Sequence, residues 1–483
     1  AINYYEKALK IKPDYAPAHY NLGIAFDELS QLDAAVNCYK QALTIKPNYA
    51  EAHNNLGFVL KELDQLDASC ESCKQALMIN PNYVEAHNNL GNVLHDLGQL
   101  NEAVNCYKKA LEIKPDYAEA HNNLGIVFKD FGQLDAAFKH YNKSLEINPD
   151  YAEARHNLSL LQLDNGYLSE GFKNYEVRWK FDKFNSTLRH QSIPQWMGES
   201  LTDKNILIWG EQGVGDEIQF STLIPEFRTL GGNIVIECAP KLVDLFQYSF
   251  PWAKVRKADT INSQERMIDS EFDYQVPMGS LAPIFRKTID DFHKKQKPFI
   301  PRLTQKEKKI RTELNLRKGQ LLIGLCWRSS VTTIKRSRTV GYLDIKDLLP
   351  FQSIKGAQFL AVQYDECQSE LNRVRSKGLA IHYDETVDQE NDLLNTTALL
   401  GACDLIISAS TAVFQLSASL GVPTLCFKVL NCEYKRIPWH PTVQYLNLDP
   451  NKPSLLVQEI ITKLPEYISW SNKVTTSERR IYS

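Results

Sequence analysis

Several features are scarce in this 483-residue sequence, and each scarcity excludes a class of protein. No apolar run approaches the roughly 18 residues that a helix needs to cross a bilayer, so no membrane span is expected. The formal net charge of −3 leaves no basic excess, and a nucleic-acid partner is therefore not expected. No acidic motif of the DxD kind stands at the end of a strand-like run. We accordingly expect no metal ion and no cofactor.

The ten cysteines do not form a metal or redox motif. Cys70 and Cys73 are spaced as CxxC, but no second pair of Cys or His follows at ligand spacing. The remaining cysteines are scattered, often beside apolar residues, as in the reducing cytoplasm. We expect free thiols and a cytoplasmic protein. The sequence begins inside a repeat unit, so we also expect the native N-terminus to lie outside it.

A 34-residue period governs the first third of the chain. Proline, alanine and glycine each recur in phase, at Pro13, Pro47, Pro81, Pro115 and Pro149, at Ala8, Ala42, Ala76 and Ala110, and at Gly23, Gly57, Gly91 and Gly125. Such a period resembles the tetratricopeptide repeat, which implies an α-solenoid of paired helices. Small residues are expected where helices approach closely, and each proline is expected just after a second helix. An aromatic-rich unit that ends near Trp179 is expected to cap the array. We place the repeat array at residues 1–183 and a linker at residues 184–204.

An asparagine recurs on the first helix of every unit, so that these residues form a polar column. They are Asn21, Asn55, Asn89, Asn123 and Asn157. Because an amide both donates and accepts, such a ladder could hold an extended peptide backbone. The column resembles the asparagine ladder of the O-GlcNAc transferase repeats, which implies a protein or peptide acceptor on the concave face, with solvent-facing side chains. The alternative is that Asn is simply the consensus residue of this slot.

The second half of the chain changes from repeats to alternating strands and helices. Short apolar runs predict buried parallel strands at residues 205–209, 233–238, 272–276, 321–327, 359–363, 379–382, 405–408 and 423–427. A polar, basic stretch at 294–318 separates two such series. We therefore predict two Rossmann-like domains of the GT-B kind, at residues 205–310 and 311–483. Ligands are expected beyond the carboxyl ends of the strands, in a cleft between the two domains.

Two segments of this half resemble a known group. The run from Glu211 to Phe220, with Gly213, Gly215 and Asp216, resembles the opening of lipopolysaccharide heptosyltransferases and of bacterial tetratricopeptide proteins with heptosyltransferase-like domains. The segments at 404–427 and 438–441 resemble the donor-binding region of the same group. The resemblance implies a metal-independent, inverting glycosyltransferase that uses a nucleotide-sugar donor. This chain has Ser410 where the group has Asp, and Gln415 where it has His.

Candidate site residues follow from the two halves of the predicted cleft. Gly213 and Gly215 would let the backbone approach a ligand, or would form an ordinary strand–helix turn. Asp216 could take a proton from an acceptor hydroxyl, with Glu211 in reserve, or could be a plain first-turn acid of its helix. Ser410, Thr411 and Ala412 would offer hydroxyl and N–H groups to a diphosphate at a helix start.

The remaining donor-side candidates follow two strands of the second series. A cationic loop could neutralise the leaving diphosphate, or could be merely solvated; its residues are Arg328, Lys335, Arg336 and Arg338. Gln363 and Tyr364 end the next strand and suit a base or ribose.

The leading interpretation is a glycosyltransferase that acts on a protein held by the repeats. A non-catalytic scaffold with a degenerate glycosyltransferase domain stays open, and so does a lipid-carbohydrate transferase whose repeats serve assembly.

Overall fold

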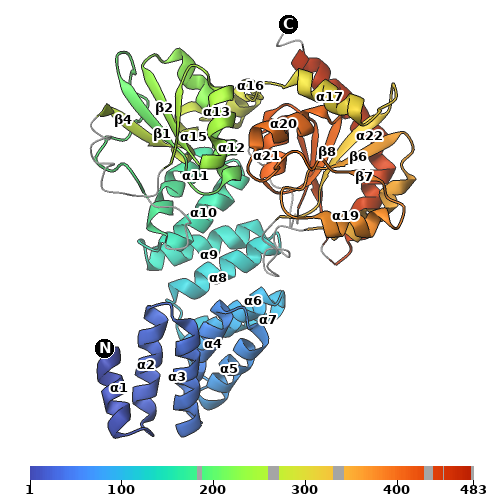
Figure 1. Cartoon of the computed structure of the whole chain (residues 1–483). Helices are drawn as coiled ribbons and strands as arrows, with labels where there is room; N and C mark the ends of the chain where they lie inside the picture. The colour runs from blue at the N-terminus through green and yellow to red at the C-terminus, as the bar shows by residue number, and fades with distance from the viewer. Residues whose placement is uncertain (182–187, 259–270, 330–341, 429–438, 450, 480–483) are drawn as a thin grey trace. The chain divides into compact units, whose positions relative to one another are not determined.

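The computed structural model describes residues 1–181, 188–258, 271–329, 342–428, 439–449 and 451–479, with side chains described up to residue 473. The chain forms two compact units, Ala1–Leu161 and Gln162–Ser483. Figure 1 colours them from blue through red along the chain.

The first unit is a row of antiparallel helices, two to a repeat (Figure 1). Its helices are α1 (Ile2–Ile11), α2 (Ala16–Glu28), α3 (Leu32–Ile45), α4 (Ala50–Glu62), α5 (Leu66–Ile79), α6 (Val84–Asp96), α7 (Leu100–Ile113), α8 (Ala118–Asp130), α9 (Leu134–Ile147) and the first part of α10 (Ala152–Asp164). The predicted solenoid of paired helices is confirmed.

Close helix packing explains the periodic glycines. A Cβ placed on Gly91 would come within 2.5 Å of the Tyr107 ring, so α6 can meet α7 only where the side chain is hydrogen. Gly57 faces Cys73 in the same way, because Cys73 occupies the slot that tyrosine fills in other repeats. Cys70 and Cys73 are free and buried in α5.

The second unit begins earlier than the array boundary predicted at residue 183. Its first elements are the end of α10, α11 (Leu168–Tyr175) and the 3-10 helix η1 (Glu176–Lys180). Leu168 and Phe172 of α11 are buried in the same hydrophobic cluster as the strands that follow. Packing therefore assigns the last repeat-like helix to the α/β unit.

Two parallel sheets make up the rest of the second unit (Figure 1). The first has the order β3-β2-β1-β4, with β1 (Asn205–Trp209), β2 (Asn233–Cys238), β3 (Lys254–Lys257) and β4 (Tyr274–Pro277). The second has the order β10-β9-β8-β5-β6-β7, with β5 (Leu321–Cys326), β6 (Ala357–Ala361), β7 (Ile381–His382), β8 (Leu405–Ala409), β9 (Thr424–Lys428) and β10 (Val443–Asn447). An α/β architecture is therefore confirmed for this unit.

Helices connect the strands. They are α12 (Val214–Ser221), η2 (Ile224–Thr229), η3 (Pro240–Leu242), α13 (Val243–Ser249), η5 (Met278–Ser280), α15 (Ala282–Phe285), α16 (Ile289–Lys295), α17 (Thr304–Glu313), η7 (Ile345–Ser353), α19 (Gln368–Arg375), α20 (Leu393–Ala402), α21 (Ala412–Ser419) and α22 (Pro453–Arg479). Their apolar sides bury the central strands, and in β1 the residues from Ile206 to Trp209 are fully buried. Side chains that carry chemistry are thus confined to strand ends and helix starts.

Candidate functional site

The starts of two helices meet at the carboxyl ends of the two sheets. Helix α12 follows β1 and helix α21 follows β8. A Cβ on Gly215 would lie 3.7 Å from Cα of Ala412, so the first turns of α12 and α21 are in contact. Unpaired N–H groups and the positive ends of both helix dipoles favour an anion at such a place.

Gly213 and Asp216 form the cap of α12. Gly213 is the N-cap, and its N–H donates to Oδ2 of Asp216 at 3.3 Å. Asp216 is half-buried in the first turn. The cap role that the sequence left open is therefore present, and it fixes the carboxylate beside the meeting point of the two helices.

Glu211 is buried and hydrogen-bonded to a cation, whereas a residue on an open turn would be exposed to solvent. Its side chain is fully buried, and Oε2 accepts hydrogen bonds from Nε and Nη2 of Arg178 at 3.1 and 3.0 Å. A Cβ on Gly279 would collide with Oε1 of the same carboxyl group. Burial raises the pKa of Glu211 to about 7, although Arg178 lowers it. The expectation of an accessible reserve base is corrected: Glu211 anchors the loop.

Glu217, which the sequence analysis missed, is a second buried carboxyl at the same sheet edge. Oε2 accepts a hydrogen bond from the backbone N–H of Ala239 at 2.9 Å, and its carboxyl group fills the space that a side chain on Gly210 would need. Burial raises the pKa of Glu217 to about 7, against the lowering effect of the Ala239 hydrogen bond. Glutamate is common in the first turn of a helix, so no sequence signal distinguishes it.

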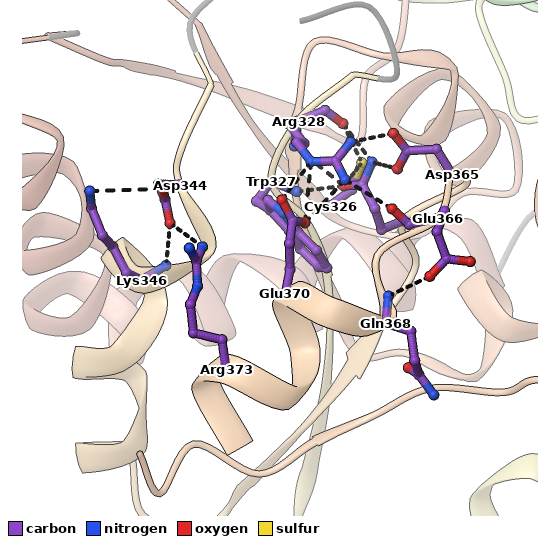
Figure 2. A network of polar contacts seen from close by, with 11 residues as sticks. Cys326, Trp327, Arg328, Asp344, Lys346, Asp365, Glu366, Gln368, Glu370 and Arg373 are labelled. Atoms are coloured by element: carbon purple, nitrogen blue, oxygen red, sulfur yellow. Dashed lines mark hydrogen bonds and ion pairs between the residues drawn. The ribbon is translucent and has the colours of Figure 1, made fainter. Parts of the chain in front are cut away.

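Arg328 is neutralised by neighbouring carboxylates (Figure 2). Its guanidinium donates to Glu370 at 3.1 Å and to Asp365 at a shorter distance, and Nη2 donates to the carbonyl of Glu366 at 3.2 Å. The prediction of a cation free for a diphosphate is therefore wrong for Arg328, because two carboxylates already surround it. Lys335, Arg336 and Arg338 lie outside the described residues.

Gln363 forms hydrogen bonds with the backbone of the loop that contains Arg328. Its Oε1 accepts from the N–H groups of Trp327 and Arg328 at 3.2 and 3.3 Å, and Nε2 donates to the carbonyl of Arg328 at 2.9 Å. The side chain is fully buried, which corrects the expectation that it faces a base or ribose. Tyr364 is half-buried, and its hydroxyl is 3.0 Å from that of Ser329.

Thr411 caps helix α21, with Oγ1 accepting from the N–H of Val413 at 3.3 Å. Ser410 and Ala412 flank it and are half-buried. The three residues therefore share one helix start, beside Gly215. Whether they hold a diphosphate stays a prediction.

A polar chain connects α12 to α21 deeper in the unit. Gln415 Nε2 donates to Gln219 Oε1 at 3.0 Å, and Gln415 Oε1 accepts a hydrogen bond from Nε2 of His440. Burial lowers the pKa of His440 to about 3, so this imidazole is neutral. A histidine thus stands beside position 415, although it comes from another part of the sequence.

The asparagine column forms hydrogen bonds between repeats. Asn89, Asn123 and Asn157 donate from Nδ2 to the residues 35 positions earlier, Asn54, Asn88 and Asn122, at 2.9, 2.9 and 3.0 Å. Asn55 donates to the hydroxyl of Tyr20 at 3.2 Å. Asn123 is buried, while Asn21, Asn55, Asn89 and Asn157 are half-buried. The expectation of freely solvent-facing amides is corrected, because their N–H groups hold adjacent repeats together.

We expect Asn123→Ala to destabilise the repeat array by about 1–3 kcal/mol, because it leaves the buried acceptor on Asn88 without a donor and removes one of the two donors to Asn92, where Tyr107 still donates. Far-UV circular dichroism during urea unfolding measures the loss. Asn21→Ala, in the equivalent slot of the first complete unit, is the control and should change stability by less than about 0.5 kcal/mol. Equal effects of the two substitutions would contradict a structural ladder.

His95 makes the array sensitive to alkaline pH. Burial alone would lower its pKa, but hydrogen bonds to Asp130, at 2.7 Å, and to Asp96 outweigh burial and raise the pKa to about 9. The stabilisation is complete below the ordinary value of 6.5 and is lost as pH rises from there to about 9. As pH rises over that window, we expect the urea concentration at the midpoint of unfolding to decrease, and to decrease less in Asp130→Asn. An unchanged slope in Asp130→Asn would contradict this coupling.

Two kinds of site are absent from the described residues. They contain no group of three or more His, Cys, Asp and Glu side chains placed to hold a metal ion. Over the same residues, no helix combines the length and apolar character needed to cross a membrane.

Comparison with known proteins identifies the repeats. The TPR repeat family model matches residues 1–30, 26–64, 59–98 and 91–132, and the tetratricopeptide repeat model matches 118–151. Residues 1–151 are therefore tetratricopeptide repeats.

Similarity extends to a curated protein and to solved structures. Protein FlbA of Caulobacter vibrioides (strain ATCC 19089 / CIP 103742 / CB 15) is 27% identical over 268 residues, which is 52% of this chain and 44% of that protein. This chain thus spans less than half of that relative. MamA is 27% identical with a TM-score of 0.29, over 32% of this chain and 89% of that one. The thermophilic TPR protein TTC0263 of Thermus thermophilus is 24% identical with a TM-score of 0.33, over 35% and 93%.

Proposed function

We propose that this protein is a metal-independent, inverting glycosyltransferase of the GT-B kind, with halves at residues 205–310 and 311–483. It would transfer a sugar from a nucleoside-diphosphate donor to a protein acceptor. The observation that carries the proposal is the contact of Gly215 with Ala412. Two helix starts, one from each parallel sheet, meet there, and their N–H groups and dipoles suit a diphosphate. The resemblance of residues 211–220 and 404–427 to heptosyltransferases supplies the reaction class.

Residue roles are divided between the two halves. Gly213, Gly215 and the Ser410–Ala412 turn would contact the diphosphate, and Asp216 would accept the proton of the acceptor hydroxyl. Gln363 would hold the loop after β5, and Arg328 would connect that loop to the segment after β6. Neither would touch the donor, because their polar atoms already form these bonds. The charge of the leaving group would be met by Lys335, Arg336 and Arg338.

The acceptor would be a basic protein segment. The first helices of the five units from α2 to α10 carry ten acidic side chains against three Lys or Arg side chains and the protonated His95, so this set of helices attracts Lys and Arg. A Lys-rich peptide should bind the chain with an affinity that falls steeply with salt, whereas a Glu-rich peptide of the same length should not bind. Equal binding of both peptides would contradict this choice of acceptor.

Nucleotide binding tests the donor part of the proposal. All seven tryptophans lie at residue 179 or later, so tryptophan fluorescence follows the second unit alone. A nucleoside diphosphate at 100 times its Kd should stabilise this unit by about 2.7 kcal/mol. UDP, GDP, ADP and dTDP are the probes, and the corresponding monophosphates are the controls. We expect one diphosphate to bind and its monophosphate to bind much more weakly.

A non-catalytic protein-binding scaffold is the second candidate. The pairing of Arg328 with Asp365 and Glu370 favours it, because that pairing removes a cation from the donor side. Ser410 and Gln415, which replace the Asp and His of the resembled group, favour it as well. Failure of all four diphosphates to bind at millimolar concentration would support the scaffold and contradict the transferase.

A further inference from the structure

Two imidazoles face each other inside one repeat. Nδ1 of His121, on α8, lies 3.0 Å from Nδ1 of His140, on α9. The ring of Phe128 stacks on that of His140, with centroids 5.2 Å apart and planes 21° apart. Both rings are half-buried, and each packs against another aromatic ring. The two nitrogen atoms therefore lie close together between two helices.

A backbone carbonyl sets the tautomer of His121. In the preceding repeats the residues of the same slot, His19, His53 and His87, bring Nε2 within 2.9–3.0 Å of a proline carbonyl six positions earlier. The backbone of Pro115 also forms a hydrogen bond with the His121 ring. Because Nδ1 of His121 faces His140, we assign this bond to Nε2, which then carries the proton and leaves a lone pair on Nδ1.

Both imidazoles are neutral near pH 7. Burial lowers the pKa of His121, and burial together with His121, Lys139 and Lys108 lowers the pKa of His140 to about 4. A metal ion binds imidazole only in its neutral form, so these neighbours keep the pair ready to coordinate. The shared hydrogen bond would be replaced by the metal, with the proton of His140 then carried on Nε2.

We propose that His121 and His140 form a binding site for a divalent transition metal of tetragonal geometry, Cu²⁺ or Ni²⁺. With metal–nitrogen bonds of about 2.0–2.1 Å, a gap of 3.0 Å between the nitrogens corresponds to an angle of about 94° at the metal. Adjacent positions of a square or octahedral ion require about 90°, whereas tetrahedral zinc requires about 109° and a gap of about 3.3 Å. The Pro115 carbonyl orients one ligand as outer-shell carbonyls do in metal sites.

The protein supplies two ligands, and water completes the coordination. The other units lack this pair, because the slot of His140 holds Cys38, Ser72 and Cys106 there. A bound ion would join α8 to α9 and stabilise this repeat.

The same repeats provide matched variants. His140→Ser introduces the residue that Ser72 places in this slot, and His121→Arg introduces the residue that Arg155 places in the other slot. Arg155 also donates to its proline carbonyl, at 2.5 Å, so His121→Arg retains that structural contact. His87→Arg makes the same change one repeat earlier, where no second imidazole is present, and serves as the control.

The test is titration of the full chain with Cu²⁺ and with Ni²⁺, followed by calorimetry and, for Cu²⁺, electron paramagnetic resonance. We expect one site in the unsubstituted chain and in His87→Arg whose spectrum shows two equatorial nitrogens. His140→Ser and His121→Arg should each weaken that site by about tenfold or more, because chelation is lost. Melting without metal checks that each variant folds.

Three results would overturn the proposal. Equal Cu²⁺ affinity in His140→Ser and the unsubstituted chain would show that other histidines bind the ion. Loss of the site in His87→Arg would place it elsewhere in the array. Zn²⁺ binding to the pair as tightly as Ni²⁺ would contradict the tetragonal geometry.

Discussion

Replacing Arg178 by Met is expected to lower the free energy of unfolding of the second unit by about 3–5 kcal/mol. The guanidinium is fully buried, and it donates to Glu211, to Ser280 at 2.8 Å and to Glu176 at 2.9 Å. It also stacks over the rings of Tyr175 and Trp179. Removing it leaves the carboxyl group of Glu211 buried without its cation. The loss should appear in urea unfolding followed by tryptophan fluorescence.

A second substitution separates charge from packing. In Arg178→Met with Glu211→Gln neither charge remains, so much of the lost stability should return. The single variant should also become less stable as pH rises from about 4.5 to above about 7. Without Arg178 the pKa of Glu211 lies further above its ordinary value of 4.5, and the unfolded chain releases the proton that the folded chain holds. A single variant within about 1 kcal/mol of the unsubstituted chain, with no dependence on pH, would contradict a buried ion pair of this strength.

The central strands could be predicted from sequence because each one is a continuous apolar run. β1 and β2 begin and end where the pattern predicts them, and β8 extends the predicted run by one residue. The two missed strands, β3 and β10, lie at sheet edges, where one side of the backbone faces no strand. β3 reads Lys-Val-Arg-Lys, and only one residue of β10 is buried. Edge strands need little apolar surface, so hydrophobicity does not reveal them.

The local part of the candidate site was predictable, and its long-range part was not. The caps at Gly213 and Thr411 depend on residues within three positions, which a sequence pattern contains. The partners of Arg328 are 37 and 42 positions away, and Glu211 and Arg178 are 33 apart. Such pairs form only once the sheets bring distant segments together. The 34-residue period predicts the register of the asparagine column, but it could not show which amides bond across repeats.

Asp216→Asn is expected to reduce sugar transfer by about two orders of magnitude or more, with nucleotide affinity nearly unchanged. In the proposed reaction the acceptor oxygen forms a bond to the anomeric carbon, and the bond from that carbon to the diphosphate oxygen breaks. The diphosphate leaves with the electron pair, and the acceptor proton passes to the carboxylate of Asp216. Asn cannot accept that proton, but its oxygen can still accept the hydrogen bond from the N–H of Gly213, so the cap of α12 persists.

The neighbouring carboxyl groups provide the decisive controls, because Glu211 and Glu217 are both buried and both have a pKa of about 7. Glu211→Gln and Glu217→Gln should reduce stability more than turnover, since their oxygens bind Arg178 and the Ala239 backbone. Turnover per folded molecule, with the folded fraction measured by tryptophan fluorescence, compares the three variants on one scale. Full turnover in Asp216→Asn beside a loss in Glu217→Gln would assign the base to Glu217. Full turnover in all three, in a chain that transfers sugar, would exclude carboxylate catalysis at this end of β1.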